Sequence, residues 1–268
     1  MNIVIDKSFL QGSSKKEIHQ MCDQYQLIMP EVLFLEILTT KNEDMVKCFN
    51  KFPIIENPVA LIPNVGTLIR YETEKNRPCS PIETQFLKIR YVFNDQLSMS
   101  QFVFTDEQKE SLQKWKTSAK EDTADFIKKA TVADDWFPEL RGYIPGQSPK
   151  PIVDAMNMIA SDIEFVRKTY SQIRDDIYKT YDTLWPEPES INKKWVLFRH
   201  LQVHLLAALE YIKKYGRESQ PTVTKRLENE YLDIDYCIVG TLSNGLATRD
   251  STMAKFYNLL CPEKRLLS

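Results

Sequence analysis

Two short apolar segments, each closed by an acidic residue, lie near opposite ends of the chain. Residues 2–5 (Asn-Ile-Val-Ile) precede Asp6, and residues 246–248 (Leu-Ala-Thr) precede Arg249-Asp250. Such segments are typical of short buried strands, and an abrupt charge marks the point where a strand leaves the sheet. Because helical segments separate them, the pattern predicts a parallel α/β sheet, whose ligand crevice lies at the carboxyl ends of the strands.

The first forty residues add a second strand and two helices to this prediction. A polar helix is expected from Lys15 to Tyr25, followed by a strand from Leu27 to Met29. Pro30 then opens another helix, because proline is favoured in the first helical turn.

The long middle of the chain, residues 42–221, is predicted to be mainly helical. It shows helical periodicity over Ile152–Leu184 and Lys194–Tyr215 and contains no internal repeat. A last helix is expected from Pro221 to Leu242, before the Ser-Asn-Gly turn that leads into the C-terminal strand.

Charge and composition argue against a strongly basic protein, a disulfide or zinc framework, and a membrane-spanning protein. The 35 basic and 37 acidic residues nearly cancel, so any contact with nucleic acid must use a local basic patch. The five cysteines are far apart and include no C-x-x-C pair, which predicts reduced thiols rather than a disulfide framework or a structural zinc site. No run of about 18 apolar residues occurs, so we expect a cytoplasmic protein without a membrane partner.

Four acidic positions are candidates for one site. A parallel sheet would place Asp6 and Asp250 at the same edge. Glu36 lies beside the apolar face of its helix, and Asp235 or its neighbour Asp233 would supply the fourth carboxylate. Four carboxylates in one cleft repel, since each pair at roughly 5 Å and an effective dielectric constant near 20 costs about 3 kcal/mol. Such a cluster predicts a cation, and its hard oxygen ligands suit Mg²⁺ or Mn²⁺.

Each acid also has an ordinary structural role open to it. An aspartate that follows a strand is often only a helix cap, and Glu36 could be a solvated residue on the rim of its helix. On a continuous helix Asp235 lines up with Ile238 on the apolar face, which favours Asp235 as the ligand. Asp233 becomes the alternative if it caps a helix that begins there.

Three stretches of the chain carry a family resemblance. They are Ile3-Val-Ile-Asp6-Lys-Ser8, Ile28-Met-Pro30-Glu-Val-Leu-Phe-Leu-Glu36, and Asp233-Ile-Asp235-Tyr-Cys-Ile-Val-Gly-Thr241 through Ala247-Thr-Arg-Asp250. These stretches resemble the PIN-domain family of metal-dependent nucleases. Lys7 departs from the family, which usually has a small residue after its first acid.

The resemblance implies both a fold and an activity. The fold would be a PIN-like parallel sheet flanked by helices, a single domain formed by residues 1–41 and 222–268 with 42–221 as an enlarged helical region. The activity would be that of a metal-dependent endoribonuclease, with Mg²⁺ or Mn²⁺ as cofactor. The implied metal ligands are Asp6, Glu36, Asp235 or Asp233, and Asp250, and the implied substrate-binding residues are Ser8, Thr248 and Arg249.

The family also implies a biological setting and partners. A toxin or defence effector acting on RNA is the setting that the resemblance favours. The protein partner would be an antitoxin, another subunit or a second copy of the chain.

Other hypotheses stay open beside this one. The chain could be a catalytically silent PIN-like binding or scaffold module, or a nuclease that acts on single-stranded DNA. Arg199 and His204 have the R-x4-H spacing seen in HEPN ribonucleases, and His200 with His204 could ligate a metal, although a polar helix stripe explains both patterns. The stretches Phe86–Phe93 and Trp195–His200 could hold single-stranded RNA, although core positions are the favoured interpretation of their aromatic residues.

Overall fold

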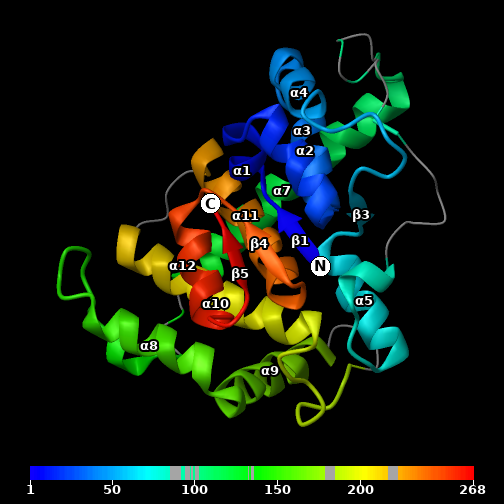
Figure 1. Ribbon diagram of the computed structural model, residues 1–268. Coiled ribbons are helices and arrows are strands. Elements are labelled where there is room, and N and C mark those ends of the chain that lie inside the picture. The colour runs from blue at the N-terminus through cyan, green and yellow to red at the C-terminus, as the bar shows by residue number, and fades with distance from the viewer. Residues whose placement is uncertain are drawn as a thin grey trace. The chain divides into compact units, whose positions relative to one another are not determined.

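A computed structural model of the chain describes residues 1–84, 92–93, 97, 99, 103–131, 133, 136–178, 185–216 and 223–268. Within them five strands pair in parallel in the order β3-β2-β1-β4-β5 (Figure 1). The strands are β1 (Asn2–Ile5), β2 (Gln26–Pro30), β3 (Ala60–Ile62), β4 (Gly245–Ala247) and β5 (Arg265–Leu267). The predicted α/β class with a parallel sheet is confirmed.

The central strand β1 is buried on both faces, as is usual in parallel sheets. Ile3, Val4 and Ile5 have no exposed surface. Ile3 aligns with Leu27 of β2 on one side and with Gly245 of β4 on the other. A side chain at 245 would collide with its neighbours, because a Cβ atom there would lie 2.7 Å from the backbone carbonyl oxygen of Arg265 and 2.5 Å from Cδ1 of Ile3.

The strand order reverses at β1. From β1 the chain builds β2 and β3 on one side of the sheet, and it later returns to add β4 and β5 on the other side. In open parallel sheets, ligands bind outside the carboxyl ends of the strands at such a reversal. The end of β1 beside the end of β4 is therefore the place where the fold favours a binding site.

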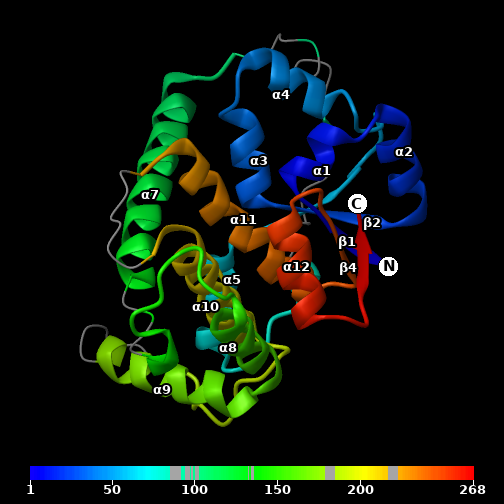
Figure 2. The ribbon, with the colours of Figure 1, turned by 90° about the vertical axis from the view of Figure 1, so that its left-hand side faces the viewer.

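The chain divides into two compact units. Unit 1 comprises residues 1–68, 80–117 and 235–268, and unit 2 comprises residues 69–79 and 118–234. Unit 1 holds the whole sheet and its helices, of which α1, α3 and α4 lie beside one another (Figure 2). Its helices are α1 (Lys7–Gly12), α2 (Lys15–Gln24), α3 (Glu31–Leu38), α4 (Asn42–Phe49) and α12 (Ser251–Leu260), with the short 3-10 helix η1 (Pro81–Thr84).

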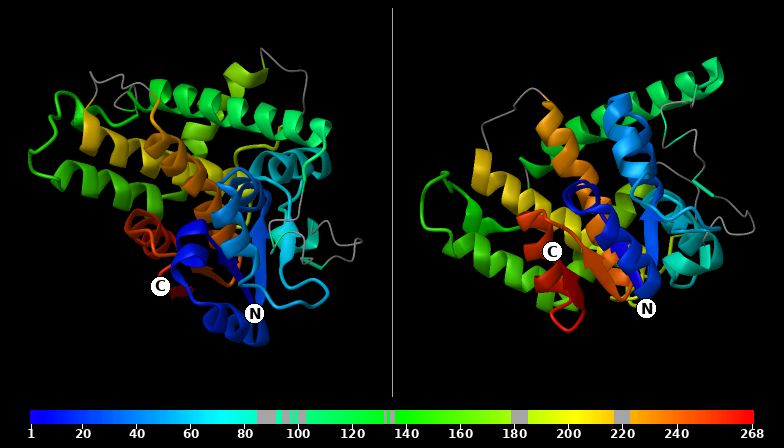
Figure 3. Two further views of the ribbon diagram at one scale, coloured as in Figure 1. Left: turned by 90° about the horizontal axis from the view of Figure 1, so that it is seen from above. Right: turned by 45° about the horizontal axis from the view of Figure 1, so that its top comes forward.

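In unit 2, helices pack on helices. The unit contains α8 (Lys150–Ser161), α9 (Ile163–Tyr178), α10 (Val196–Tyr215) and the 3-10 helix η3 (Pro138–Leu140). Helices α8 and α10 run side by side (Figures 1 and 3). Three further helices contribute residues to both units: α5 (Val65–Lys75), α7 (Asp106–Ala130) and α11 (Lys225–Leu242).

Most predicted elements are present, with two differences in the middle region. The helix expected over Ile152–Leu184 is two helices, because the chain leaves helical geometry at Asp162, and residues 179–184 lie outside the described part. The strand β3 falls inside the region expected to be mainly helical. Neither β3 nor β5 was predicted, because each has only three residues and, unlike β4, neither is followed closely by an acid that marks a strand end.

A buried glutamate fixes the start of α10 within unit 2. Glu72 of α5 has no exposed surface. Its carboxylate accepts hydrogen bonds from the backbone N–H groups of Cys79 (2.9 Å), Val196 (2.7 Å) and Leu197 (2.9 Å). The last two are among the first N–H groups of α10, which have no partner inside the helix. Glu72 thus caps α10 from a distant part of the sequence.

Two structural findings concern the cysteines and the apolar segments. All five cysteines are described, and none forms a disulfide. Among the residues that the structure describes, no helix combines the length and apolar character that a bilayer crossing requires.

Candidate functional site

Asp6 lies directly after β1 and caps the helix α1. Its Oδ1 accepts a hydrogen bond of 2.6 Å from the backbone N–H of Phe9. The Ser8 hydroxyl lies 2.9 and 2.8 Å from its two carboxylate oxygens, and the Thr248 hydroxyl donates to Oδ2. Asp6 is only 1% exposed. The carboxylate is therefore held in one orientation by a backbone group and two hydroxyls.

Strand β4 brings Thr248, Arg249 and Asp250 to the same edge of the sheet. The backbone N–H of Asp6 donates to the carbonyl of Ala247 at 3.1 Å, which continues the sheet pairing to this edge. The N–H of Arg249 donates to Oγ of Ser8 at 2.8 Å, and that of Asp250 donates to Oγ1 of Thr248 at 3.0 Å. The four predicted residues Ser8, Thr248, Arg249 and Asp250 thus gather around Asp6.

Asp250 caps α12 in the same way that Asp6 caps α1. Its Oδ1 accepts a hydrogen bond of 2.8 Å from the N–H of Met253. The structural role expected of an aspartate after a strand is thus confirmed for both residues. A helix cap uses one carboxylate oxygen and the charge is not required for it, since asparagine caps as well as aspartate.

The two aspartates interact electrostatically. Burial raises the pKa of Asp6, the hydrogen bonds from Thr248, Phe9 and Ser8 lower it, and the charge of Asp250 raises it further. The effect of the Asp250 charge on Asp6 has the sign expected from the sequence, but it is smaller than the effects of burial and of each hydrogen bond. A cation between the two carboxylates would relieve this repulsion.

Glu36 is held by two other side chains of unit 1. It is 4% exposed, so it is not a solvated residue on the rim of α3. Its Oε1 accepts a hydrogen bond of 3.1 Å from Nζ of Lys7, and its Oε2 accepts one from the hydroxyl of Tyr236. The departure at Lys7 thus has a structural meaning, because this lysine supplies the positive charge that a buried carboxylate needs.

Asp233 and Asp235, the two candidate acids of α11, remain alternatives as the metal ligand. The helix begins at Lys225, so Asp233 does not cap a helix that starts there. Both Asp233 and Asp235 are half-buried. The choice between them as a metal ligand stays open.

Of the four predicted acids, the structure brings Asp6 and Asp250 together as a pair, and it does not show all four in one cluster. In the described part of the chain, no three or more His, Cys, Asp or Glu side chains are grouped so that they could hold a metal ion. Asp6 and Asp250 interact, whereas Glu36 is bonded to Lys7 and Tyr236. The four-acid metal centre stays a prediction.

The residues of the HEPN pattern have structural partners within unit 2. The guanidinium of Arg199 donates to the carbonyl of Lys193 at 3.0 Å and to Oε1 of Gln202 at 2.9 Å. The rings of His200 and His204 lie with their centroids 3.9 Å apart and their planes tilted by 42°, and burial lowers the pKa of His204 to about 4. This arrangement favours the interpretation that these residues are a polar stripe along α10 rather than catalytic residues.

The two aromatic stretches do not form a described nucleic-acid surface. Residues 86–91 lie outside the described part of the chain. Phe93 is buried against Phe49 and Phe52 in unit 1, and Trp195 is buried in the core of unit 2. The core interpretation is confirmed for these two residues.

Sequence reasoning missed Tyr236 and the role of Lys7. Both act on Glu36, which is bonded to Tyr236 from a position 200 residues away in the sequence. A tyrosine at such a distance has no spacing signature. Lys7 was noticed only as a departure from the family.

Comparison of the chain with family models, curated proteins and solved structures finds no match to any of them.

Proposed function

We propose that this chain is a PIN-like, metal-dependent endonuclease that cleaves RNA, with single-stranded DNA as the alternative substrate. The observation that carries the proposal is the meeting of Asp6 and Asp250 at the carboxyl ends of neighbouring parallel strands. The strand order reverses at this place, where open α/β sheets bind their ligands. Repelling carboxylates in such a position call for a cation.

The donor set fits Mg²⁺ or Mn²⁺. Asp6 and Asp250 offer carboxylate oxygens, and Ser8 and Thr248 offer hydroxyl oxygens beside them. Mg²⁺ keeps several waters and is usually held by one or two carboxylates together with substrate phosphates, so the pair is sufficient to bind it. Including Glu36 in the metal centre would require Lys7 to give up its ion pair.

The residues of the site have separate roles in this proposal. The hydroxyls of Ser8 and Thr248 orient the Asp6 carboxylate, and the N–H of Met253 orients that of Asp250. Arg249, between Thr248 and Asp250, is exposed, and in this proposal its guanidinium binds a phosphate oxygen. A bound metal ion would polarise the scissile phosphate and lower the pKa of the attacking water.

The biological setting follows from the family resemblance alone. It favours a toxin or defence effector, whose protein partner would be an antitoxin, another subunit or a second copy of the chain.

The first test is metal dependence. We expect the purified chain to cleave labelled single-stranded RNA with Mg²⁺ or Mn²⁺ and to lose the activity in EDTA, because the metal would polarise the scissile phosphate and lower the pKa of the attacking water. Parallel reactions with DNA of the same sequence decide between the two substrates. Undiminished cleavage in EDTA would overturn the metal-dependent mechanism.

A second candidate function is a catalytically silent PIN-like binding module. The observation that favours it is the ion pair between Lys7 and Glu36, which holds a fixed cation on one of the four predicted acids. A lysine in this position neutralises Glu36 without supporting hydrolysis. Under this hypothesis the wild-type chain cleaves neither RNA nor DNA with any divalent metal.

Replacing Lys7 by Ala separates the two candidates. Without Lys7 the Glu36 carboxylate becomes available as a third ligand, so Mn²⁺ should bind more tightly, by about tenfold or more. Isothermal titration with Mn²⁺ measures the effect, with the exposed Lys16→Ala variant as control. If Mn²⁺ binds only to the Lys7→Ala protein, the silent module is favoured. If it binds to both and the wild type cleaves, the nuclease is favoured.

A further inference from the structure

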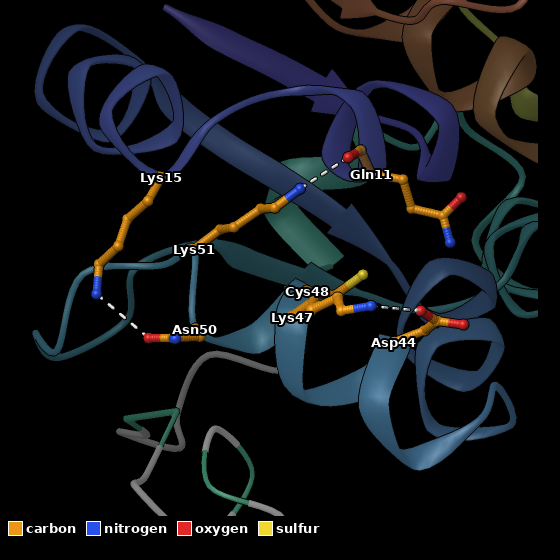
Figure 4. A pocket seen from close by; sticks show the side chains of 7 residues that line it. All are labelled: Gln11, Lys15, Asp44, Lys47, Cys48, Asn50 and Lys51. Carbon is orange, nitrogen blue, oxygen red and sulfur yellow. Dashed lines mark hydrogen bonds and ion pairs between the residues drawn. The ribbon is translucent and has the colours of Figure 1, made fainter.

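Unit 1 contains a cavity of about 540 Å³ that is lined mainly by polar and basic side chains (Figure 4). It lies against the end of α1, the start of α2 and the end of α4. Three lysines point toward it, and Asp44 is the one acid among its lining residues. The lining residues are Gln11, Lys15, Asp44, Lys47, Cys48, Asn50 and Lys51.

The three lysines are positioned in different ways. Lys51 donates to the carbonyls of Leu10 and Gln11 at 2.7 and 2.8 Å, so the C-terminal end of α1 fixes its ammonium group. Lys15 contacts Oδ1 of Asn50 at 3.2 Å and Lys47 contacts Asp44 at 3.4 Å, as the dashed lines in Figure 4 show. Weak exposed contacts of this kind leave an ammonium group available to a stronger anion.

Arg249 connects this cavity with the acidic site. Its backbone N–H is bonded to Ser8 beside Asp6, whereas its side chain extends over Gly12, at the end of α1. There its charge acts on Lys51 and on Glu17. The basic residues therefore begin next to Asp250 and continue along α1 into the cavity.

The charged residues between Asp250 and the cavity, here called the basic path, favour the binding of an anion. Apart from Asp6 and Asp250 of the acidic site, Lys15, Lys47, Lys51 and Arg249 carry four positive charges, against two negative charges from Asp44 and Glu17. The whole chain has a net charge of −2, so this concentration of positive charge is a local feature. Phosphate groups in series are the ligand that such a path suits, since each lysine or arginine can replace a counterion.

We propose that the cavity and Arg249 bind the phosphodiester backbone of a single-stranded nucleic acid next to the phosphate held at Asp6 and Asp250. The inference rests on the proposed nuclease function and adds the direction in which the strand leaves the site, along α1 toward α2 and α4. Base identity would contribute little here, because the lining offers charge rather than aromatic stacking.

The test is a binding measurement without cleavage. Fluorescence anisotropy in EDTA gives the Kd of the full chain for fluorescein-labelled oligouridylate and for oligodeoxythymidylate of equal length. The test variant is Lys15→Gln/Lys47→Gln. The matched control is Lys109→Gln/Lys114→Gln on α7, which removes the same charge from two exposed lysines, each paired like Lys47 with an acid within about one helical turn.

We expect the test variant to bind about tenfold more weakly at moderate salt, and its salt dependence to be less steep by about 1.4 in the logarithmic slope, because two phosphate contacts are lost. The control should keep the wild-type Kd and slope. Circular dichroism establishes that all variants are folded. The RNA and DNA arms decide which nucleic acid is the preferred ligand.

The outcomes keep this inference and the nuclease proposal apart. Weaker binding by the test variant alone supports the basic path even if the wild type never cleaves. An equal Kd for the test and control variants overturns the proposal that the basic path binds nucleic acid, even if metal-dependent cleavage is found. Absence of binding by the wild type to either nucleic acid overturns it as well.

Discussion

Asp250→Asn is expected to reduce metal-dependent cleavage by at least about 100-fold, which corresponds to roughly 2.7 kcal/mol of lost transition-state stabilisation. The physical reason is the loss of one of the two carboxylates that would hold the metal. The change is nearly isosteric, and asparagine still accepts the hydrogen bond from Met253 that starts α12. Cleavage of labelled RNA by wild type and variant at saturating Mg²⁺ measures the effect.

The same variant should not lose stability when metal is absent. The charge of Asp250 acts unfavourably on the buried carboxylate of Asp6, so removing it relieves a repulsion and the melting temperature in EDTA should be equal or higher. Asp250→Ala is the control, because it also removes the cap and should cost about 1 kcal/mol. A melting temperature for Asp250→Asn well below that of the wild type, with activity lost only in proportion to unfolding, would mark Asp250 as structural.

Glu72→Leu is expected to lower the free energy of unfolding at pH 5 by at least about 3 kcal/mol, because each buried N–H group left without an acceptor costs about 1–3 kcal/mol. Three such groups, those of Cys79, Val196 and Leu197, depend on this side chain. Urea denaturation followed by tryptophan fluorescence measures the change, since Trp195 is buried next to the affected turn. Glu74→Leu, an exposed position on the same helix, is the matched control.

The effect of Glu72 should also depend on pH. Burial raises the pKa of Glu72 from 4.5 to about 7, against the lowering effect of its backbone hydrogen bonds. Between these values the folded protein keeps a proton that the unfolded chain has lost, so the contribution of Glu72 to stability is complete below pH 4.5 and decreases as the pH rises to about 7. The difference between wild type and Glu72→Leu should therefore be larger at pH 4.5 than at pH 8. An equal difference at both pH values would contradict the raised pKa.

The sequence alone determined the fold class and the places where acids meet the sheet. Short β-branched runs are recognisable because strand preference depends on local side-chain shape, and β1 and β2 were found in this way. The helices α2, α10 and α11 were recognised within a few residues because apolar periodicity and helix-terminal residues are local signals. The positions of Asp6 and Asp250 at strand ends follow from the same patterns.

The tertiary structure decided which side chains act on one another. Asp6 has its hydroxyl partner in Thr248, Glu36 has Lys7 and Tyr236, and Glu72 caps a helix that starts 124 residues later. The basic cavity likewise gathers lysines from α2 and α4 that have no common motif. Pairing at such distances depends on the packing of strands and helices into layers, and local sequence does not encode it. The sequence could therefore propose the acids of the site, and only the folded chain could show their partners.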